Sequence, residues 1–209
     1  MKIIGNKDTI DWYDKNAKKY ASDSDNITFE DTARQFLKKI KPNPKILEVG
    51  CGSGRDAITL TELGASVTGI DASEGLIKVA KQKSSDIEFL VGNFLDLPFQ
   101  DGTFDGIWSH ASLVHLDTTE DVETAFRQFN RVLKTDGYLY IYVKKQYEEE
   151  KTAIVSDSLS NHDRFFRYYT EDELTLLLTK AGFTIDEITT EADVHGRKEV
   201  TWIKLFAKK

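Results

Sequence analysis

Short apolar runs alternate with amphipathic stretches through the middle of the chain. Five runs have the length and the β-branched or aromatic content of buried strands: residues 46–49, 67–70, 87–91, 104–109 and 138–143. Three stretches between them repeat apolar residues at helical spacing: residues 55–63, 72–83 and 119–133. Strands that alternate with helices in this way predict parallel βαβ units, with helices on both faces of one sheet.

The N-terminal flank predicts two helices, at residues 11–20 and 27–40. Pro42 and Pro44 end the second helix and lead into the first strand. In the first helix, aromatic residues recur at near-helical intervals. The simplest interpretation is an aromatic face packed on the edge of the domain.

The C-terminal flank predicts one more helix and two more strands. Thr170 and Glu173 have the spacing of a capping box, and Gly182 ends the helix that it opens. The runs 183–188 and 201–207 have no helix between them, so we expect a hairpin. The expected fold is α/β, a doubly wound, mostly parallel seven-stranded sheet with an antiparallel last strand.

The segment from residue 144 to 160 interrupts this rhythm, because it is long, polar and partly acidic. Residues 161–169 then mix charged and aromatic side chains. Long loops in compact domains are often lids or substrate sites. We therefore interpret residues 144–169 as a loop-rich, substrate-side insertion in a single domain that spans residues 1–209.

A glycine-rich turn follows the first strand, with Gly50, Gly52 and Gly54 at alternate positions. The next helix leads to a second strand that ends on Asp71. Glycines allow a ligand to approach the backbone closely, and a carboxylate at the end of the second strand suits the hydroxyls of a ribose. This unit predicts a nucleoside-binding site.

Glu48 decides which nucleoside suits the turn. The glycine pattern also fits a dinucleotide site, but a pyrophosphate needs unopposed N–H groups at a helix N-terminus. A carboxylate beside the turn would repel phosphate and attract a cation. S-adenosylmethionine has that charge pattern, with an ammonium and a sulfonium on one side and a ribose on the other.

The order E-V-G-C-G-S-G followed by V-T-G-I-D resembles the class I, seven-stranded, Rossmann-like S-adenosylmethionine-dependent methyltransferases. The resemblance covers residues 45–145 well and the flanks more loosely. It implies that Glu48, Gly50, Gly52 and Gly54 hold the methionine end of the cofactor.

The same resemblance assigns the rest of the cofactor. Asp71, with Ala72 beside it, would bind the ribose, and Asn93 with Phe94 would bind the adenine. Asn93 stands where the family has an acidic residue. Residues 1–41 would form a helical cap in which Tyr20 closes the site.

Composition narrows the function classes. A chain of 209 residues with 40% hydrophobic content can bury one full α/β core, and no apolar run is long enough to span a membrane. A net charge of −7 disfavours a nucleic-acid substrate, and the single cysteine suits a reducing compartment. We therefore expect a cytoplasmic monomer or homodimer that acts on a small-molecule acceptor.

Catalytic candidates follow the fourth strand, whose C-terminal end should reach the methyl-transfer centre. Ser109 is expected near the cofactor, and His110 and His115 are candidate general bases. An ordinary loop or core role is the alternative for each histidine.

His162, Arg164 and Arg167 form a candidate acceptor-binding cluster in the late insertion. The two arginines can clamp a carboxylate or stack on a ring, or they can be salt-bridged for structural reasons. No metal-binding pattern is present in the sequence.

Three other functions fit the sequence less well: a tRNA or protein methyltransferase that needs a partner, a cofactor-binding protein without activity, and a dinucleotide-dependent oxidoreductase.

Overall fold

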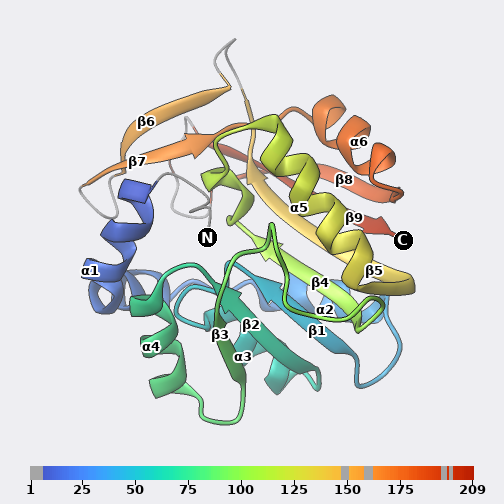
Figure 1. Ribbon diagram of the computed structural model, residues 1–209, viewed down its shortest axis with the longest axis horizontal. Coiled ribbons are helices and arrows are strands. Elements are labelled where there is room, and N and C mark those ends of the chain that lie inside the picture. The colour runs from blue at the N-terminus through green and yellow to red at the C-terminus, as the bar shows by residue number, and fades with distance from the viewer. Residues whose placement is uncertain (1–6, 147–150, 158–161, 194–196, 198–199) are drawn as a thin grey trace.

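The computed structural model describes residues 7–146, 151–157, 162–193, 197 and 200–209. These residues fold around one seven-stranded sheet in the order β3-β2-β1-β4-β5-β9-β8 (Figure 1). Its strands are β1 (Lys45–Val49), β2 (Ser66–Asp71), β3 (Glu88–Val91), β4 (Phe104–His110), β5 (Leu133–Lys144), β8 (Thr184–Ala192) and β9 (Thr201–Lys208). Only β9 runs antiparallel to its neighbours, β5 and β8. The predicted doubly wound sheet with an antiparallel last strand is therefore confirmed.

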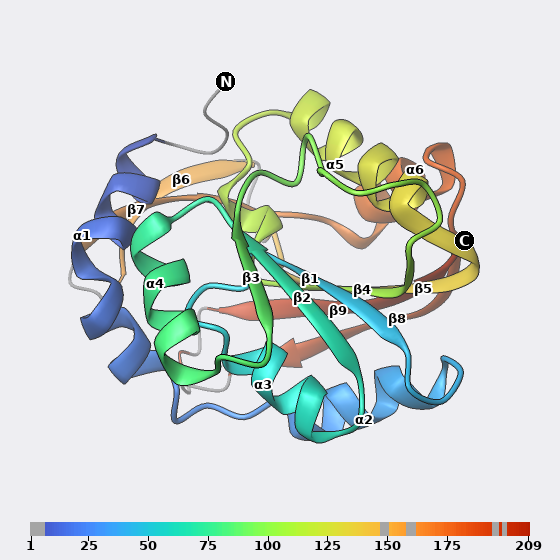
Figure 2. The same cartoon turned by 60° about the horizontal axis from the view of Figure 1, so that its bottom comes forward.

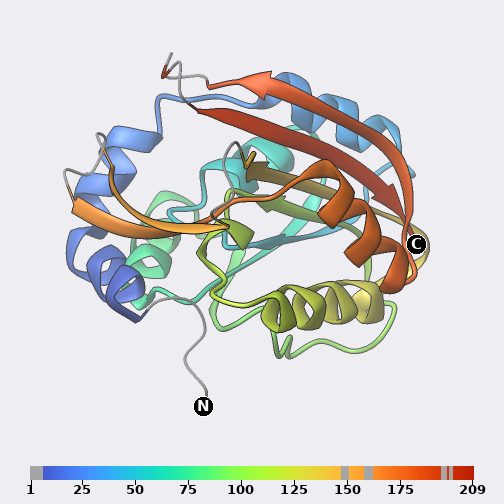
Figure 3. The same cartoon turned by 90° about the horizontal axis from the view of Figure 1, so that it is seen from above.

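Helices cover both faces of the sheet. They are α1 (Lys7–Ser24), α2 (Glu30–Lys38), α3 (Arg55–Glu62), α4 (Glu74–Lys83), α5 (Thr119–Val132) and α6 (Glu171–Lys180), with a short 3₁₀ helix η1 (Leu113–His115). Figure 3 shows α2 and α3 on one face and α5 and α6 on the other. The first helix, α1, lies against α4 at one end of the sheet (Figure 2).

Side-chain caps fix where several helices begin. Ser73 accepts a hydrogen bond from the Leu76 N–H at the start of α4. Thr170 accepts one from the Glu173 N–H at the start of α6, as predicted. The Glu173 carboxylate, which would complete a capping box, instead binds Arg167 over 2.8 Å. The local pattern therefore marked the helix start correctly, but a tertiary ion pair uses its acidic member.

The α1 helix is longer at both ends than the predicted 11–20. Thr9, Trp12, Ala17 and Ala21 are its buried residues, and they recur along one face of the helix. Two of these positions lie outside the predicted range, because small and polar residues there are buried by tertiary contacts.

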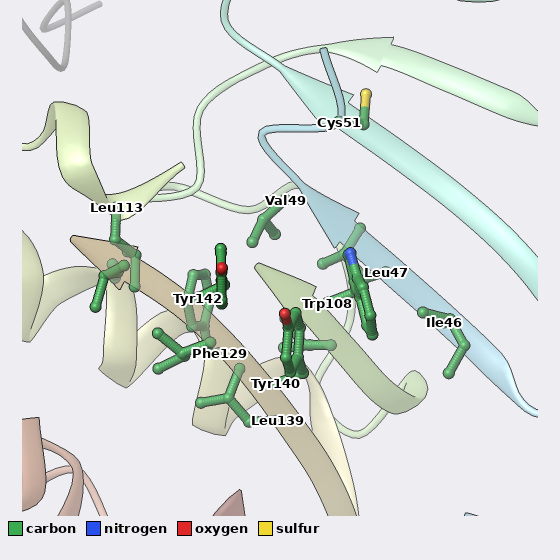
Figure 4. Close-up of a cluster of buried hydrophobic side chains, with 14 of the residues drawn as sticks. Ile46, Leu47, Val49, Cys51, Trp108, Leu113, Phe129, Leu139, Tyr140 and Tyr142 are labelled. Carbon is green, nitrogen blue, oxygen red and sulfur yellow. The ribbon is translucent and has the colours of Figure 1, made fainter. Parts of the chain in front are cut away.

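An aromatic slab forms the core on the α2 side of the sheet. Phe36 of α2 packs on Trp108 of β4, and Trp108 stacks on Tyr140 of β5 with ring centroids 3.9 Å apart (Figure 4). Alternate residues of a strand share a face, so His110 and Tyr142 continue this slab one step further. The rings of His110 and Tyr142 therefore lie at the carboxyl-terminal ends of β4 and β5.

The segment after β5 differs from the prediction. Residues 144–160 were expected to be a loop, but β6 (Thr152–Asp157) and β7 (His162–Arg167) pair as a separate two-stranded antiparallel sheet. Phe166 of β7 is buried, and β7 packs against η1 and α1 (Figure 1). The loop prediction was therefore wrong for residues 152–157, because their pairing with β7 depends on contacts with distant elements.

Candidate functional site

One cavity of about 410 Å³ lies at the carboxyl ends of the parallel strands. It is bounded by the turns after β1, β2, β3 and β4, and by residues of α1, β7 and β9. The predicted cofactor residues that line it are Tyr20, Glu48, Gly50, Gly52, Asp71, Ala72, Asn93 and Phe94. His110, His115 and Arg164 line it as well. This is the place where open α/β sheets bind their ligands.

The turn after β1 presents backbone to the cavity. Gly52 has a φ of +54°, and a Cβ added there would meet nothing within 4 Å. Gly50 has a φ of +69°, and its Cβ would lie 2.2 Å from the Ser112 Cβ. Both positions therefore require glycine, Gly50 for packing and Gly52 for its left-handed backbone. The open space beside Gly52 is a cradle that a ligand can fill.

Asp71 is fixed at the end of β2 by two backbone donors. Its Oδ2 accepts from the Gly52 N–H and its Oδ1 from the Ser73 N–H, each over 2.8 Å. Burial raises the pKa of Asp71, and the nearby Asp14 raises it further, while the two backbone hydrogen bonds lower it. Each oxygen keeps a second lone pair, so the carboxylate can accept hydrogen bonds from two adjacent hydroxyls.

Glu48 places a carboxylate against the cavity with one oxygen unsatisfied. Its side chain is 3% exposed, and Oε2 has no hydrogen-bond partner among the described residues. Burial raises the pKa of Glu48 well above its usual range, and Asp56 and Asp71 raise it further against the effect of Arg55. A buried acceptor without a donor is costly. A cationic group in the cavity would satisfy it, so Glu48 and the Gly52 cradle fit S-adenosylmethionine.

Asn93 and Phe94 lie after β3 at the other end of the cavity. The Asn93 Oδ1 accepts a hydrogen bond from the Leu95 N–H over 2.8 Å. The oxygen that was expected to bind an adenine amine is thus used once by the turn itself. Its second lone pair is what remains for a ligand.

Tyr13 joins the elements that cover the cavity. Its hydroxyl lies 3.2 Å from the His115 Nε2 and is hydrogen-bonded by Arg164 of β7. The other ring nitrogen of His115 lies 3.0 Å from the Phe165 carbonyl oxygen. Both nitrogens of His115 therefore contact protein groups, which favours a structural role for this histidine. Tyr20, predicted to close the site, packs edge-on against Tyr13 at 5.0 Å.

His110 is held differently, because its polar contacts within the described part of the chain fall on one ring nitrogen. Its Nδ1 lies 3.5 Å from the Asp56 Oδ2 and 3.5 Å from the Tyr140 hydroxyl. Asp56 also accepts hydrogen bonds from Arg55 Nε, over 2.6 Å, and from Trp108 Nε1, over 2.9 Å. Both contacts of His110 fall on Nδ1, so its Nε2 is the ring nitrogen left to meet a molecule in the cavity.

Electrostatics keep this pair as a neutral imidazole beside an anion. Burial, assisted by Arg55 and opposed by Asp56, lowers the pKa of His110 to about 3. Burial opposes ionisation of Asp56, but Arg55, His110 and the hydrogen bond from Trp108 lower its pKa to about 2. At neutral pH, His110 is therefore a hydrogen-bond acceptor and Asp56 is charged.

Aromatic rings surround the part of the cavity next to His110. The ring of Phe29 lies 4.0 Å from that of His110, and the ring of Tyr142 lies 4.6 Å from it. Trp202 stacks on Tyr142 at 4.8 Å with an interplanar angle of 6°, and its Nε1 donates to Asp193. The Tyr142 hydroxyl is buried and has no hydrogen-bond partner within the described part of the chain. These rings line the cavity beside His110.

Two predicted cofactor residues lie outside the cavity wall. Gly54 has a φ of +80° at the start of α3, and a Cβ there would lie 2.8 Å from the Phe89 ring. Its role is therefore in packing. Ser109 is fully buried, and its hydroxyl lies 2.8 Å from that of Ser112. It faces the opposite side of the sheet from His110, as neighbouring strand residues do.

The predicted acceptor-binding cluster is divided between two faces of β7. Arg164 lines the cavity, where its guanidinium lies among aromatic rings. Arg167 is turned away and binds Thr119 and Glu173, each by its Nη2. The side chain of His162 lies outside the described residues. Of the two roles left open for the arginines, the ion-paired one holds for Arg167.

Several cavity residues were not predicted from the sequence. Asp56 carries no distinctive signal in the sequence, since an acidic residue in the first turn of a helix is common. Phe29, Tyr142 and Trp202 were indistinguishable from core aromatics. The sequence signal is the alternation of side chains along a strand, which places Trp108 and His110 on one face of β4 and Tyr140 and Tyr142 on one face of β5.

The described residues contain no group of three or more His, Cys, Asp or Glu side chains that could hold a metal ion. Among the same residues, no helix has both the length and the apolar character needed to cross a membrane.

Comparison with known proteins gives consistent matches. A family described as a methyltransferase domain matches residues 47–141. An O-methyltransferase from Aspergillus nomiae is 31% identical over 168 residues, which cover 73% of this chain and 69% of that protein. One from Aspergillus sclerotiorum is 36% identical over 164 residues, covering 71% of this chain. The match spans 58% of that second relative.

A solved structure is similar over most of the chain. It is a SAM-dependent methyltransferase from Methanosarcina mazei, with a TM-score of 0.75 and 26% identity. The similarity covers 83% of this chain and 95% of that one.

Proposed function

This chain belongs to the class I S-adenosylmethionine-dependent methyltransferases, and on that premise we propose that it methylates a hydroxyl group on a small, ring-containing acceptor. The observation that carries the proposal is the His110 imidazole at the cavity wall, with Nδ1 beside Asp56 and aromatic rings around it. The O-methyltransferases among its relatives support the choice of a hydroxyl.

The proposed cofactor residues each offer a matching group. Glu48 offers an unsatisfied carboxylate to the ammonium, and Asp71 offers two oxygens to the ribose hydroxyls. Asn93 and Phe94 would meet the adenine, and Tyr20 would cover the site from α1. Bound here, S-adenosylmethionine supplies a methyl group on a sulfonium whose leaving thioether is neutral.

The chain contributes positioning and a proton acceptor. Walls made of rings and a cover made of α1 and β7 exclude water and hold the acceptor in contact, which accounts for much of the rate in such displacements. His110 Nε2 takes the hydroxyl proton. An oxygen that is gaining a methyl group becomes strongly acidic, so the imidazole can take its proton as a general base.

The aromatic lining of the cavity supports a ring-containing acceptor. The Phe29 ring lies 4.0 Å and the Tyr142 ring 4.6 Å from that of His110, and Trp202 stacks on Tyr142. Aromatic pairs favour stacked or edge-on contacts at such distances. We propose that residues 1–41 act as the cap of this site and that residues 144–169 act as its acceptor-side insertion.

The test is methyl transfer from radiolabelled S-adenosylmethionine to matched sets of ring compounds. Catechol, 4-hydroxybenzoate and 8-hydroxyquinoline would be compared with the corresponding amines and thiols. We expect ether products from the hydroxyl compounds and a large loss of rate in His110→Asn. Transfer to amines or thiols alone would refute the hydroxyl assignment, and no transfer to any member would refute the small-acceptor assignment.

A further inference from the structure

A buried carboxylate beside the cavity contacts three side chains, one of which is the candidate base His110. Asp56 is 5% exposed, accepts hydrogen bonds from Arg55 Nε and Trp108 Nε1, and lies 3.5 Å from His110 Nδ1. It lines the cavity together with Arg55 and His110. An anion in such a place is costly to desolvate, and clusters of this kind gather at functional sites.

The arrangement aims one carboxylate oxygen at His110. Oδ1 of Asp56 is taken by Arg55, while Oδ2 faces Trp108 and His110. Trp108 is itself fixed, because it is fully buried and stacks on Tyr140 at 3.9 Å. Hydrogen bonds from Arg55 and Trp108 therefore fix the position of the Asp56 carboxylate next to the imidazole of His110.

We propose that Asp56 is a positioning residue that fixes the tautomer and the orientation of His110, with the proton on Nδ1 and the lone pair of Nε2 toward the acceptor. The proposal rests on the proposed function for its catalytic meaning. An ionised carboxylate only accepts hydrogen bonds, so the proton between the two groups belongs to the imidazole. A lone pair on Nδ1 would instead face a negative charge.

The competing arrangement involves Tyr140. Its hydroxyl also lies 3.5 Å from His110 Nδ1. If this hydroxyl donated to Nδ1, the imidazole proton would sit on Nε2, and His110 could not accept a proton from the acceptor. The Asp56 charge decides between the two tautomers.

The proton balance follows from this arrangement. The proton that the acceptor hydroxyl loses on methylation passes to Nε2, and the electron pair of the O–H bond stays on the ether oxygen. His110 becomes an imidazolium with both nitrogens protonated. Its positive charge then lies beside the Asp56 carboxylate, which stabilises it. Deprotonation to solvent after product release restores the starting state.

The first arm of the test needs no acceptor. Long-range ¹H–¹⁵N spectra of the ¹⁵N-histidine protein report which ring nitrogen carries the proton. His110→Asn identifies the His110 signals among the four histidines. We expect a pure Nδ1–H tautomer in the wild type and a mixture in Asp56→Asn. An Nε2–H tautomer in the wild type would overturn the proposal without any variant.

The second arm uses the acceptor compounds named above. Asp56→Asn should lower kcat on the order of 100-fold, the size of a general-base contribution. The double variant Asp56→Asn/His110→Asn should be no slower than His110→Asn alone. Losses that multiply would mean that Asp56 acts independently of His110, which contradicts the proposal.

Asp105→Asn is the matched control. Asp105 is equally buried, at the other end of β4, and binds Lys134 and the Lys45 N–H. Its loss should lower stability and spare kcat. If no compound is methylated, the proposed function fails while the spectra still decide the role of Asp56.

Discussion

Glu48 offers the sharpest test of how the cofactor is bound, because its carboxylate is buried and one of its oxygens has no hydrogen-bond partner among the described residues. A pKa raised by burial means that the free protein holds a proton on Glu48 more tightly than an exposed glutamate does. A cationic ammonium binds only the ionised form. Binding should therefore release a proton, and affinity should fall tenfold per pH unit below the raised pKa.

Replacement by glutamine separates binding from stability. Glu48→Gln keeps the shape and removes the charge, so binding of S-adenosylmethionine should weaken by about 10- to 100-fold, the 1.5–3 kcal/mol of a charge-assisted hydrogen bond. Stability should move the other way. The stability that Glu48 contributes is present below its unfolded pKa and is lost as pH rises through the raised folded value. Above that raised value, the free energy of unfolding of Glu48→Gln should therefore exceed that of the wild type by about 1–3 kcal/mol.

Calorimetry in two buffers of different ionisation enthalpy counts the protons released. The matched ligand is 5′-methylthioadenosine, which has the nucleoside and the thioether but no ammonium. It should bind both proteins equally and release no proton. Equal proton release from wild type and Glu48→Gln, or an equal loss of affinity for both ligands, would refute the assignment of Glu48 to the ammonium.

Three further predictions follow from the packing and the charges. In Gly75→Ala, the new Cβ would lie 2.5 Å from the Asp14 backbone oxygen, so α1 must shift from α4. We expect a higher Kd for S-adenosylmethionine in this variant. An unchanged Kd together with a higher Tm would contradict the prediction. Tyr142→Phe removes a buried hydroxyl that has no hydrogen-bond partner among the described residues. The free energy of unfolding should therefore rise by about 1 kcal/mol, which raises the Tm by about 2–4 °C. A lower Tm would reveal a partner for the hydroxyl. Because the pKa of His110 is lowered to about 3, it stays neutral above that pH, and kcat should show no acid limb near pH 6.5. A limb there that His110→Asn abolishes would show an exposed, ordinary histidine.

The sheet could be predicted because its signal is local and repeated. Each strand is an apolar run of its own, and Ser73 and Thr170 cap helices through bonds within three residues. The glycine turn and Asp71 are likewise close in sequence, which made the nucleoside end of the site recognisable. The hairpin of β6 and β7 carries no such signal, because Phe166 is buried against η1 and α1.

The acceptor end of the site could not be predicted, since it depends on distances between strands. His110 and His115 follow the same strand and looked alike in the sequence. The structure separates them by their partners: His115 contacts Tyr13 and a β7 carbonyl, while His110 faces Asp56. Asp56 lies 54 residues before His110, and only the pairing of β1 with β4 brings the two together.

The attachment of α1 has a consequence for the order of events in a catalytic cycle. Asp14 of this helix caps the start of α4, where it accepts from Ser73 and the Gly75 N–H, while Tyr13 binds η1 and β7. Neighbouring residues thus tie one helix to the ribose side and to the acceptor side of a single cavity. We expect a movement of α1 to open both sides of the cavity at once. Substrates would then enter, and products leave, through the same opening, and the rate at which α1 moves would be an upper limit on turnover.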